Sequence, residues 1–154
     1  MKLRTLAATL VLGFGLTTPM MAGDAISEAL VKQSQKNVKA ISSEELQKMI
    51  DDADEFISLD VREEHMREEG VFDSEEDVKI ARGVLEFDIG AAIPNKKAFI
   101  VVYCRAGKSA ALAADTMKRQ LGYTNVVYLK GGLDEWLEEG HSIYNHFGEM
   151  VLAK

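Results

Sequence analysis

Short apolar segments alternate with amphipathic ones along the chain, and this alternation predicts the secondary structure. The strongest apolar run is residues 98–103, whose β-branched and aromatic residues are typical of a central parallel strand covered on both faces. The acidic segment 71–81 predicts turns. Four further segments are predicted to form strands, namely residues 38–41, 56–60, 84–89 and 126–129.

Helical periodicity fills the segments between these strands. Ser42 and Glu45 have the spacing of a capping box, which predicts the start of a helix that ends near residue 51. The segment 109–121 has small apolar residues at helical spacing. Further helices are predicted over residues 23–36 and 63–69 and around Trp136.

Strands that alternate with helices predict an α/β domain with a central, mostly parallel sheet of five strands and helices on both faces. We expect a helical N-terminal extension over residues 23–36 and one domain over residues 37–154. Ligands of such sheets bind at the carboxyl ends of the strands. Cys104 directly follows the strongest predicted strand, so we expect the functional site there.

The first residues have the pattern of an export signal. Lys2 and Arg4 precede an apolar run over residues 6–16, and Ala22 is a suitable cleavage position. The run is shorter than the roughly 20 residues that a membrane-spanning helix needs. We therefore expect residues 1–22 to be a signal peptide, and the mature protein to be periplasmic or secreted without membrane attachment.

The chain is acidic, with a formal net charge of -7. Removing residues 1–22 takes away two positive charges and no negative ones, which changes the net charge to -9. Such a charge disfavours binding to nucleic acid or to an anionic membrane. Any anion-binding site must be a local exception to it.

Cys104 is the single cysteine, so no disulfide is expected within the chain. Composition alone favours a structural thiol. Its position reverses this interpretation, because a loop that enters a helix offers unpaired backbone N–H groups that stabilise an anion. Gly107 permits a tight turn, and Arg105 and Lys108 add positive charge. We therefore expect a reactive thiolate.

Other polar residues have simpler interpretations. Asp60 and Arg62 are expected to form structural contacts at a strand end, and Trp136 to pack in the core. The histidines do not have the spacing of metal ligands, so no metal or cofactor is expected; they are His65, His141 and His146.

Four motifs follow one another along the chain, namely LDVRE at 59–63, ARGVLEF at 81–87, CRAGKS at 104–109 and KGGLDEW at 130–136. In this order they resemble the motifs of rhodanese-type sulfurtransferase domains. The resemblance covers about residues 38–140 and implies a rhodanese-like fold. The segment 70–77 reads GVFDSEED where the family commonly has a Gly-His-Ile-Pro-Gly-Ala-type sequence. This departure concerns the rim of the site and therefore the choice of donor.

The resemblance implies that Cys104 attacks the outer sulfur of a small-molecule donor such as thiosulfate, releases sulfite and holds a persulfide. A thiophilic acceptor, cyanide or a thiol, then removes the sulfur. The donor is expected to bind main-chain N–H groups and two basic side chains of the loop, with Arg82 at the pocket mouth; the loop residues are Arg105, Ala106, Gly107, Lys108 and Ser109.

Two other functions remain open. One is a non-catalytic sulfide carrier or binding module with a protein partner, suggested by the N-terminal extension and the altered segment 70–77. The other is an arsenate reductase that uses a partner's thiol. A cysteine-dependent phosphatase is disfavoured, because such enzymes have an arginine at the position of Ala110.

Overall fold

The computed structural model describes residues 22–152, with side chains from Ala25 onward. The predicted signal peptide, residues 1–22, lies outside the described residues except for Ala22, where the first helix begins. Among the described helices, none is long and apolar enough to cross a membrane.

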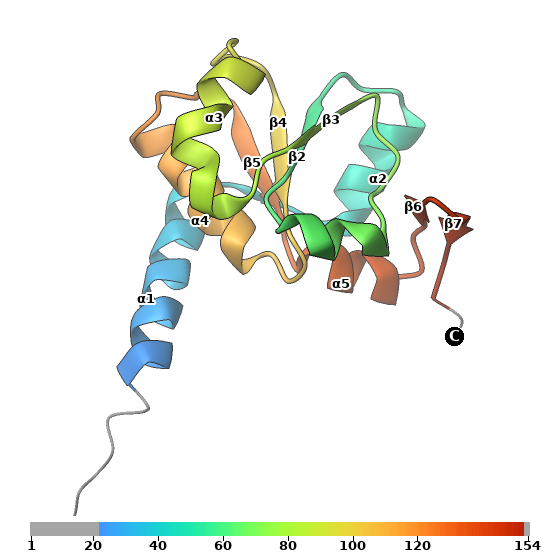
Figure 1. Ribbon diagram of the computed structural model, residues 1–154, viewed down its shortest axis with the longest axis horizontal. Helices are drawn as coiled ribbons and strands as arrows, with labels where there is room; N and C mark the ends of the chain where they lie inside the picture. Colours follow the sequence, from blue (N-terminus) through green and yellow to red (C-terminus); the bar gives the residue numbers. More distant parts are fainter. Residues whose placement is uncertain (1–21, 153–154) are drawn as a thin grey trace, which may run out of the picture.

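Five strands form one sheet in the order β1-β5-β4-β2-β3, and every neighbouring pair is parallel (Figure 1). Strand β4 is central and buried along its whole length, because helices cover both of its faces. The α/β prediction with a five-stranded parallel sheet is therefore confirmed. The strand bounds are β1 Ala40–Ile41, β2 Ile57–Asp60, β3 Glu76–Lys79, β4 Ile100–Tyr103 and β5 Val126–Leu129.

Helices cover both faces of this sheet, with α3 and α4 on one face and α2 and α5 on the other (Figure 1). A capping box formed by Ser42 and Glu45 starts α2, as the sequence predicts. The bounds are α1 Ala22–Asn37, α2 Ser43–Asp51, α3 Leu85–Ala92, α4 Lys108–Arg119 and α5 Gly132–Glu138. Within residues 22–152, two 3-10 helices, η2 Glu64–Glu69 and η3 Arg82–Val84, and the hairpin of β6 Ile143–Asn145 and β7 Gly148–Met150 are also present.

The fifth strand is not the one that the sequence predicts. Residues 84–89 belong largely to helix α3, in which Leu85 and Ile89 are buried one turn apart while Phe87 is exposed. The fifth strand is β3, from the segment predicted to form turns. It pairs with β2 at the sheet edge, and its side chains stay partly exposed, so it needs no apolar sequence.

Alternating side chains of β4 enter two separate cores. Ile100 and Val102 pack toward α3 and α4, whereas Val101 and Tyr103 pack toward α2 and α5. Cys104 continues the alternation and faces the α3 and α4 side. The alternation of side chains along β4 therefore places the Cys104 thiol on the face of the sheet that α3 and α4 cover.

Helix α1, over the segment predicted as a helical extension, packs against α4. At the centre of this contact, which we call the α1–α4 joint, lies Asp115, a carboxylate of α4 that is only 4% exposed. Asp115 accepts hydrogen bonds from Ser34 Oγ at 3.1 Å and Asn37 Nδ2 at 3.1 Å, and it pairs with Arg119 at 2.5 Å. The Arg119 partner chiefly lowers the pKa of Asp115, so the carboxylate stays charged within this joint.

Candidate active site

Cys104 lies at the carboxyl edge of the sheet, between β4 and α4. The starts of α4 and α5 lie at this same edge (Figure 1). The residue is 6% exposed. Gly107, the residue before α4, has a φ of 75°, a left-handed conformation that favours glycine, and this turns the chain directly from the loop into the helix.

The loop directs backbone N–H groups at the Cys104 sulfur. The N–H of Ala110 donates to Sγ at 3.4 Å. The N–H groups of Ala106, Gly107 and Ser109 also stabilise the thiolate form. Such a ring of amides at a helix N-terminus favours a negative charge on sulfur. We call these four groups the amide cradle.

Burial and the amide cradle shift the pKa of Cys104 in opposite directions, and the effect of burial is the larger. Desolvation raises the pKa of the Cys104 thiol above its ordinary value, although the N–H groups of the cradle, with Ala110 first, lower it. The expected depression of this pKa is therefore wrong. The amides stabilise an anion, but water is largely excluded from the sulfur, and this burial favours the protonated thiol.

The Gly131-Gly132 pair supports the loop from outside. Backbone N–H groups at the start of α5 donate to the loop carbonyls, Leu133 to Cys104 at 3.1 Å and Asp134 to Arg105 at 2.9 Å. A Cβ atom at Gly132 would overlap both carbonyls, so only glycine permits this approach. Since the carbonyls are bound to α5, the loop N–H groups are left to face the sulfur. The sequence contained this signal in the KGGLDEW motif, but its role became clear only from the contacts.

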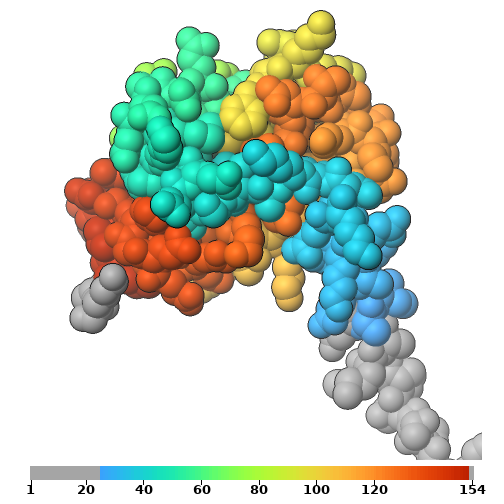
Figure 2. All heavy atoms as spheres, turned by 180° about the vertical axis from the view of Figure 1, so that it is seen from behind, coloured from blue at the N-terminus to red at the C-terminus, as the bar shows by residue number. Residues whose placement is uncertain are grey.

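The two basic side chains of the loop have different neighbours, and their predicted role in donor binding stays a prediction. Arg105 forms ion pairs with Glu69 and Asp134, both at 3.2 Å. Lys108 and Ser109 line a groove of about 580 Å³ between α1 and α4. Figure 2 shows α1 projecting from the body of the molecule. The roles of Glu69 and Asp134 were not predicted, because both residues are distant from Arg105 in sequence and Glu69 belongs to the charged segment 63–69.

Arg82 lies along α4. Its guanidinium donates to the Glu86 carboxylate at 3.0 Å and to the Thr116 hydroxyl at 3.1 Å. Thr116 is about 9 Å of helix rise beyond Ala110, which contacts the sulfur. The position of Arg82 at the pocket mouth therefore stays a prediction.

Arg62 and Asp60 form a buried ion pair at the end of β2. Arg62 Nη2 lies 2.7 Å from Asp60 Oδ2, and both side chains are at most 1% exposed. The guanidinium also donates to the carbonyls of Gly70 at 2.8 Å and Met66 at 3.1 Å. The pair thus anchors η2, in keeping with the structural role expected of it.

The described residues contain no group of three or more His, Cys, Asp or Glu that is arranged to hold a metal ion. His141 stacks on the buried Trp136 ring, with the centroids 4.3 Å apart.

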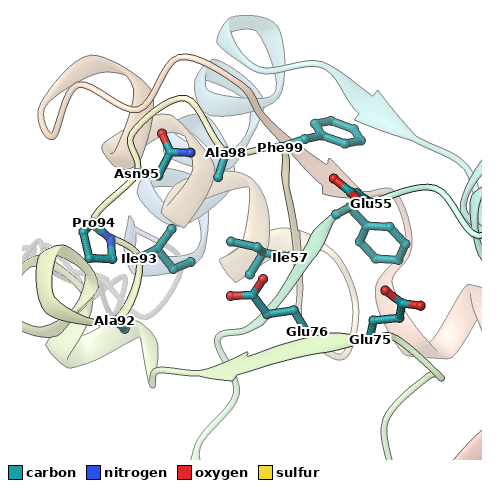
Figure 3. A pocket seen from close by; sticks show the side chains of 11 residues that line it. Glu55, Ile57, Glu75, Glu76, Ala92, Ile93, Pro94, Asn95, Ala98 and Phe99 are labelled. Atoms are coloured by element: carbon teal, nitrogen blue, oxygen red, sulfur yellow. The ribbon is translucent and has the colours of Figure 1, made fainter.

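A second pocket, of about 470 Å³, lies at the opposite edge of the sheet, where the strands begin (Figure 3). It is lined by side chains that include Glu55, Glu76, Ile57 and Phe99. It begins at the amino ends of β2 and β3, whereas Cys104 follows the carboxyl end of β4. The pocket is therefore separate from the candidate active site.

Comparison with known proteins identifies related folds. A polysulfide-sulfur transferase homodimer from Wolinella succinogenes is 26% identical, with a TM-score of 0.65 over 84% of this chain and 90% of its own. A Rhodopseudomonas palustris protein of unknown function, described as a possible tyrosine phosphatase, shares the fold at 20% identity, with a TM-score of 0.67 over 90% of this chain and 99% of its own.

A rhodanese-related protein from Thermoplasma volcanium is 26% identical, with a TM-score of 0.56 over 67% of this chain and 94% of its own. The search of curated proteins finds no match. The rhodanese-like domain family matches residues 42–139, a segment that runs from α2 to α5 and contains the Cys104 loop. By this match, the chain belongs to the rhodanese-like domain family.

Proposed function

We propose that this protein is a sulfurtransferase that carries sulfane sulfur as a persulfide on Cys104. The observation that carries the proposal is the amide cradle, in which the N–H groups of Ala106, Gly107, Ser109 and Ala110 stabilise negative charge on this sulfur. A persulfide has its charge on the outer sulfur, and clustered N–H groups suit such an anion without an added cation.

The reaction begins when the Cys104 thiol loses its proton to solvent. The thiolate attacks the outer sulfur of thiosulfate, and the sulfur–sulfur bond of the donor breaks with its electron pair on sulfite. The cradle then stabilises the Cys104 persulfide. An acceptor thiolate or cyanide attacks the outer sulfur and returns the Cys104 thiolate.

The comparisons support sulfur chemistry at the family level. The Wolinella succinogenes protein is named a polysulfide-sulfur transferase, and its identity of 26% extends over most of both chains. The possible phosphatase supports the fold alone at 20% identity. In this chain Ala110 is buried and apolar where a phosphatase has its arginine.

A sulfide carrier is the second candidate, and the burial of Cys104 favours it. A thiol that is 6% exposed, with a raised pKa, reacts slowly with small donors at neutral pH. A carrier would form a lasting persulfide and release it only to a protein partner. Rapid repeated turnover with cyanide or a small thiol would exclude this candidate.

The test is intact mass spectrometry of the purified protein before and after thiosulfate. We expect the protein to gain one sulfur atom, and Cys104→Ser to gain none. Wild type blocked with iodoacetamide serves as the control for non-specific addition. If wild type gains no sulfur from thiosulfate or from an alkyl persulfide, the proposal fails. The same spectrum of protein expressed from the full sequence tests the proposed export, because it reports whether residues 1–22 are removed.

A further inference from the structure

Arg105, the residue after the proposed nucleophile, is held between two carboxylates. Its Nη1 lies 3.2 Å from Glu69 Oε1, and its Nε lies 3.2 Å from Asp134 Oδ1. The three side chains are about half exposed, 55% for Arg105 and 47% for each carboxylate. These three side chains alone have a net charge of one negative unit, although the sequence alone suggests a cation at this position. Glu69 Oε2 also lies 3.9 Å from Nη1 of the buried Arg62.

Both carboxylates are themselves positioned by the fold. Glu69 belongs to η2, which the buried Arg62 anchors through the carbonyls of Met66 and Gly70. Asp134 donates its backbone N–H to the Arg105 carbonyl at 2.9 Å while its side chain binds the guanidinium. The two carboxylates therefore come from separate elements that are both fixed against the Cys104 loop.

The other loop cation, Lys108, lies beside the groove between α1 and α4 and, among the described residues, forms no ion pair with either of these carboxylates. Lys108 is the first residue of α4 and lines the groove beside α1, together with Glu28 and Lys32. The groups shown to contact the sulfur are uncharged backbone N–H groups, and the next residue, Arg105, already has its charge balanced by two carboxylates. A dianionic donor therefore gains less binding free energy beside Arg105 than it would beside an arginine without carboxylate partners.

We propose that Glu69 and Asp134 act through Arg105 as specificity-determining residues, and that they make the site prefer monoanionic sulfur donors to dianionic ones. The inference rests on the proposed function, because it concerns the donor of the same Cys104 persulfide. The favoured class is a singly charged sulfane donor such as an alkyl persulfide or an alkanethiosulfonate. Thiosulfate is the disfavoured dianion.

Methanethiosulfonate and thiosulfate form a matched pair of probes. In both, the Cys104 thiolate bonds to the outer sulfur and the donor's sulfur–sulfur bond breaks, with the electron pair leaving on methanesulfinate or sulfite. The same Cys104 persulfide results in each case. The donors differ in one unit of negative charge, so a difference in their KM values reports the charge preference of the mouth.

The first experiment compares Glu69→Gln and Asp134→Asn with wild type in transfer from both donors to cyanide. Each substitution should lower the KM for thiosulfate by about threefold relative to the KM for methanethiosulfonate, because Arg105 becomes available to the dianion. The kcat values should change little. Glu68→Gln removes a neighbouring exposed charge of η2 and should leave the KM ratio unchanged.

The pathway through Arg105 is tested in an Arg105→Gln background. There, Glu69→Gln should no longer alter the KM ratio. An unchanged ratio in the single variants, or the same change with and without Arg105, overturns the proposal. The melting temperature of each variant is measured as well, so that a change in donor preference can be distinguished from a change in folding.

Alkylation of Cys104 provides a readout that does not require sulfur transfer. The ratio of the rate constants for iodoacetate, an anion, and iodoacetamide, which is neutral, should rise about threefold in Glu69→Gln and stay constant in Glu68→Gln. If wild type forms no persulfide but this ratio responds, the proposed function fails and the role of the carboxylates stands. If persulfide forms but the ratio is constant, or if neither reagent reaches Cys104, the present inference fails.

Discussion

At the scale of single residues, the chemistry of Cys104 depends on a balance between burial and backbone amides. Burial raises the pKa of the thiol more than the N–H groups of the cradle lower it. We predict that alkylation of Cys104 by iodoacetamide is slower at pH 7 than that of a free cysteine and still increases above pH of about 8.5, the ordinary thiol value. Mass spectrometry of timed samples over a pH series measures this. A rate that levels off below that value contradicts the prediction.

The raised pKa of Cys104 also makes the stability of the protein depend on pH. The folded protein binds the thiol proton more tightly than the unfolded chain does, so the contribution is complete below the unfolded pKa and is lost as pH rises through the higher folded value. The free energy of unfolding, measured with urea, should therefore fall more at alkaline pH in wild type than in Cys104→Ser. The tyrosines titrate in both proteins, so the difference reports Cys104.

Gly132 shows how one missing Cβ atom shapes the site. We predict that Gly132→Ala destabilises the protein by about 2–4 kcal/mol, because its φ of 63° is unfavourable for alanine and the added Cβ overlaps the carbonyls of Cys104 and Arg105. Persulfide formation should slow with it. The control is Gly90→Ala in α3, where a Cβ meets nothing within 4 Å and a gain of up to about 1 kcal/mol is expected. Urea unfolding of both variants measures the difference, and equal stabilities would argue against close contact at Gly132.

At the scale of elements, Asp115 joins α1 to α4. We predict that Asp115→Asn destabilises the protein by about 1–2 kcal/mol, because an amide cannot accept from Ser34, Asn37 and Arg119 together. Hydrogen exchange should increase in α1 and stay unchanged in β4. Asp88→Asn, an exposed position in α3, is the control. Unchanged protection of α1 would show that apolar contacts alone hold this helix.

The charge of Asp115 also predicts the response of this joint to acid. Its folded pKa is lowered, chiefly by Arg119, so its contribution is present above the unfolded value of about 3.9 and is lost as pH falls through the lower folded value. Asp115→Asn should lack this part of the acid destabilisation.

At the scale of the whole molecule, net charge opposes the entry of anionic donors. The full chain has a formal charge of -7. We predict that kcat/KM for thiosulfate rises with salt concentration, because the Debye length shortens from about 10 Å at 0.1 M and screens this repulsion. The effect should be weaker for methanethiosulfonate. Initial rates over a series of sodium chloride concentrations measure it, and a fall with salt would indicate a locally positive mouth.

The sequence by itself determined the α/β class, the central buried strand and the place of Cys104 after it, because these depend on local apolar patterns and on the rule that sites lie at strand ends. It failed for the edge strand β3, whose polar residues pair with only one neighbour and therefore carry no clear pattern.

Only the tertiary structure decided the charge state around the sulfur. The raised pKa of Cys104 depends on how deeply the loop is covered, and the balanced charge of Arg105 depends on Glu69 and Asp134, which are distant in sequence. Burial and long-range ion pairs are set by packing between elements, and no local pattern records them. The proposed nucleophile could therefore be predicted from the sequence, whereas its reactivity and its proposed donor preference depend on residues that only the fold brings near it.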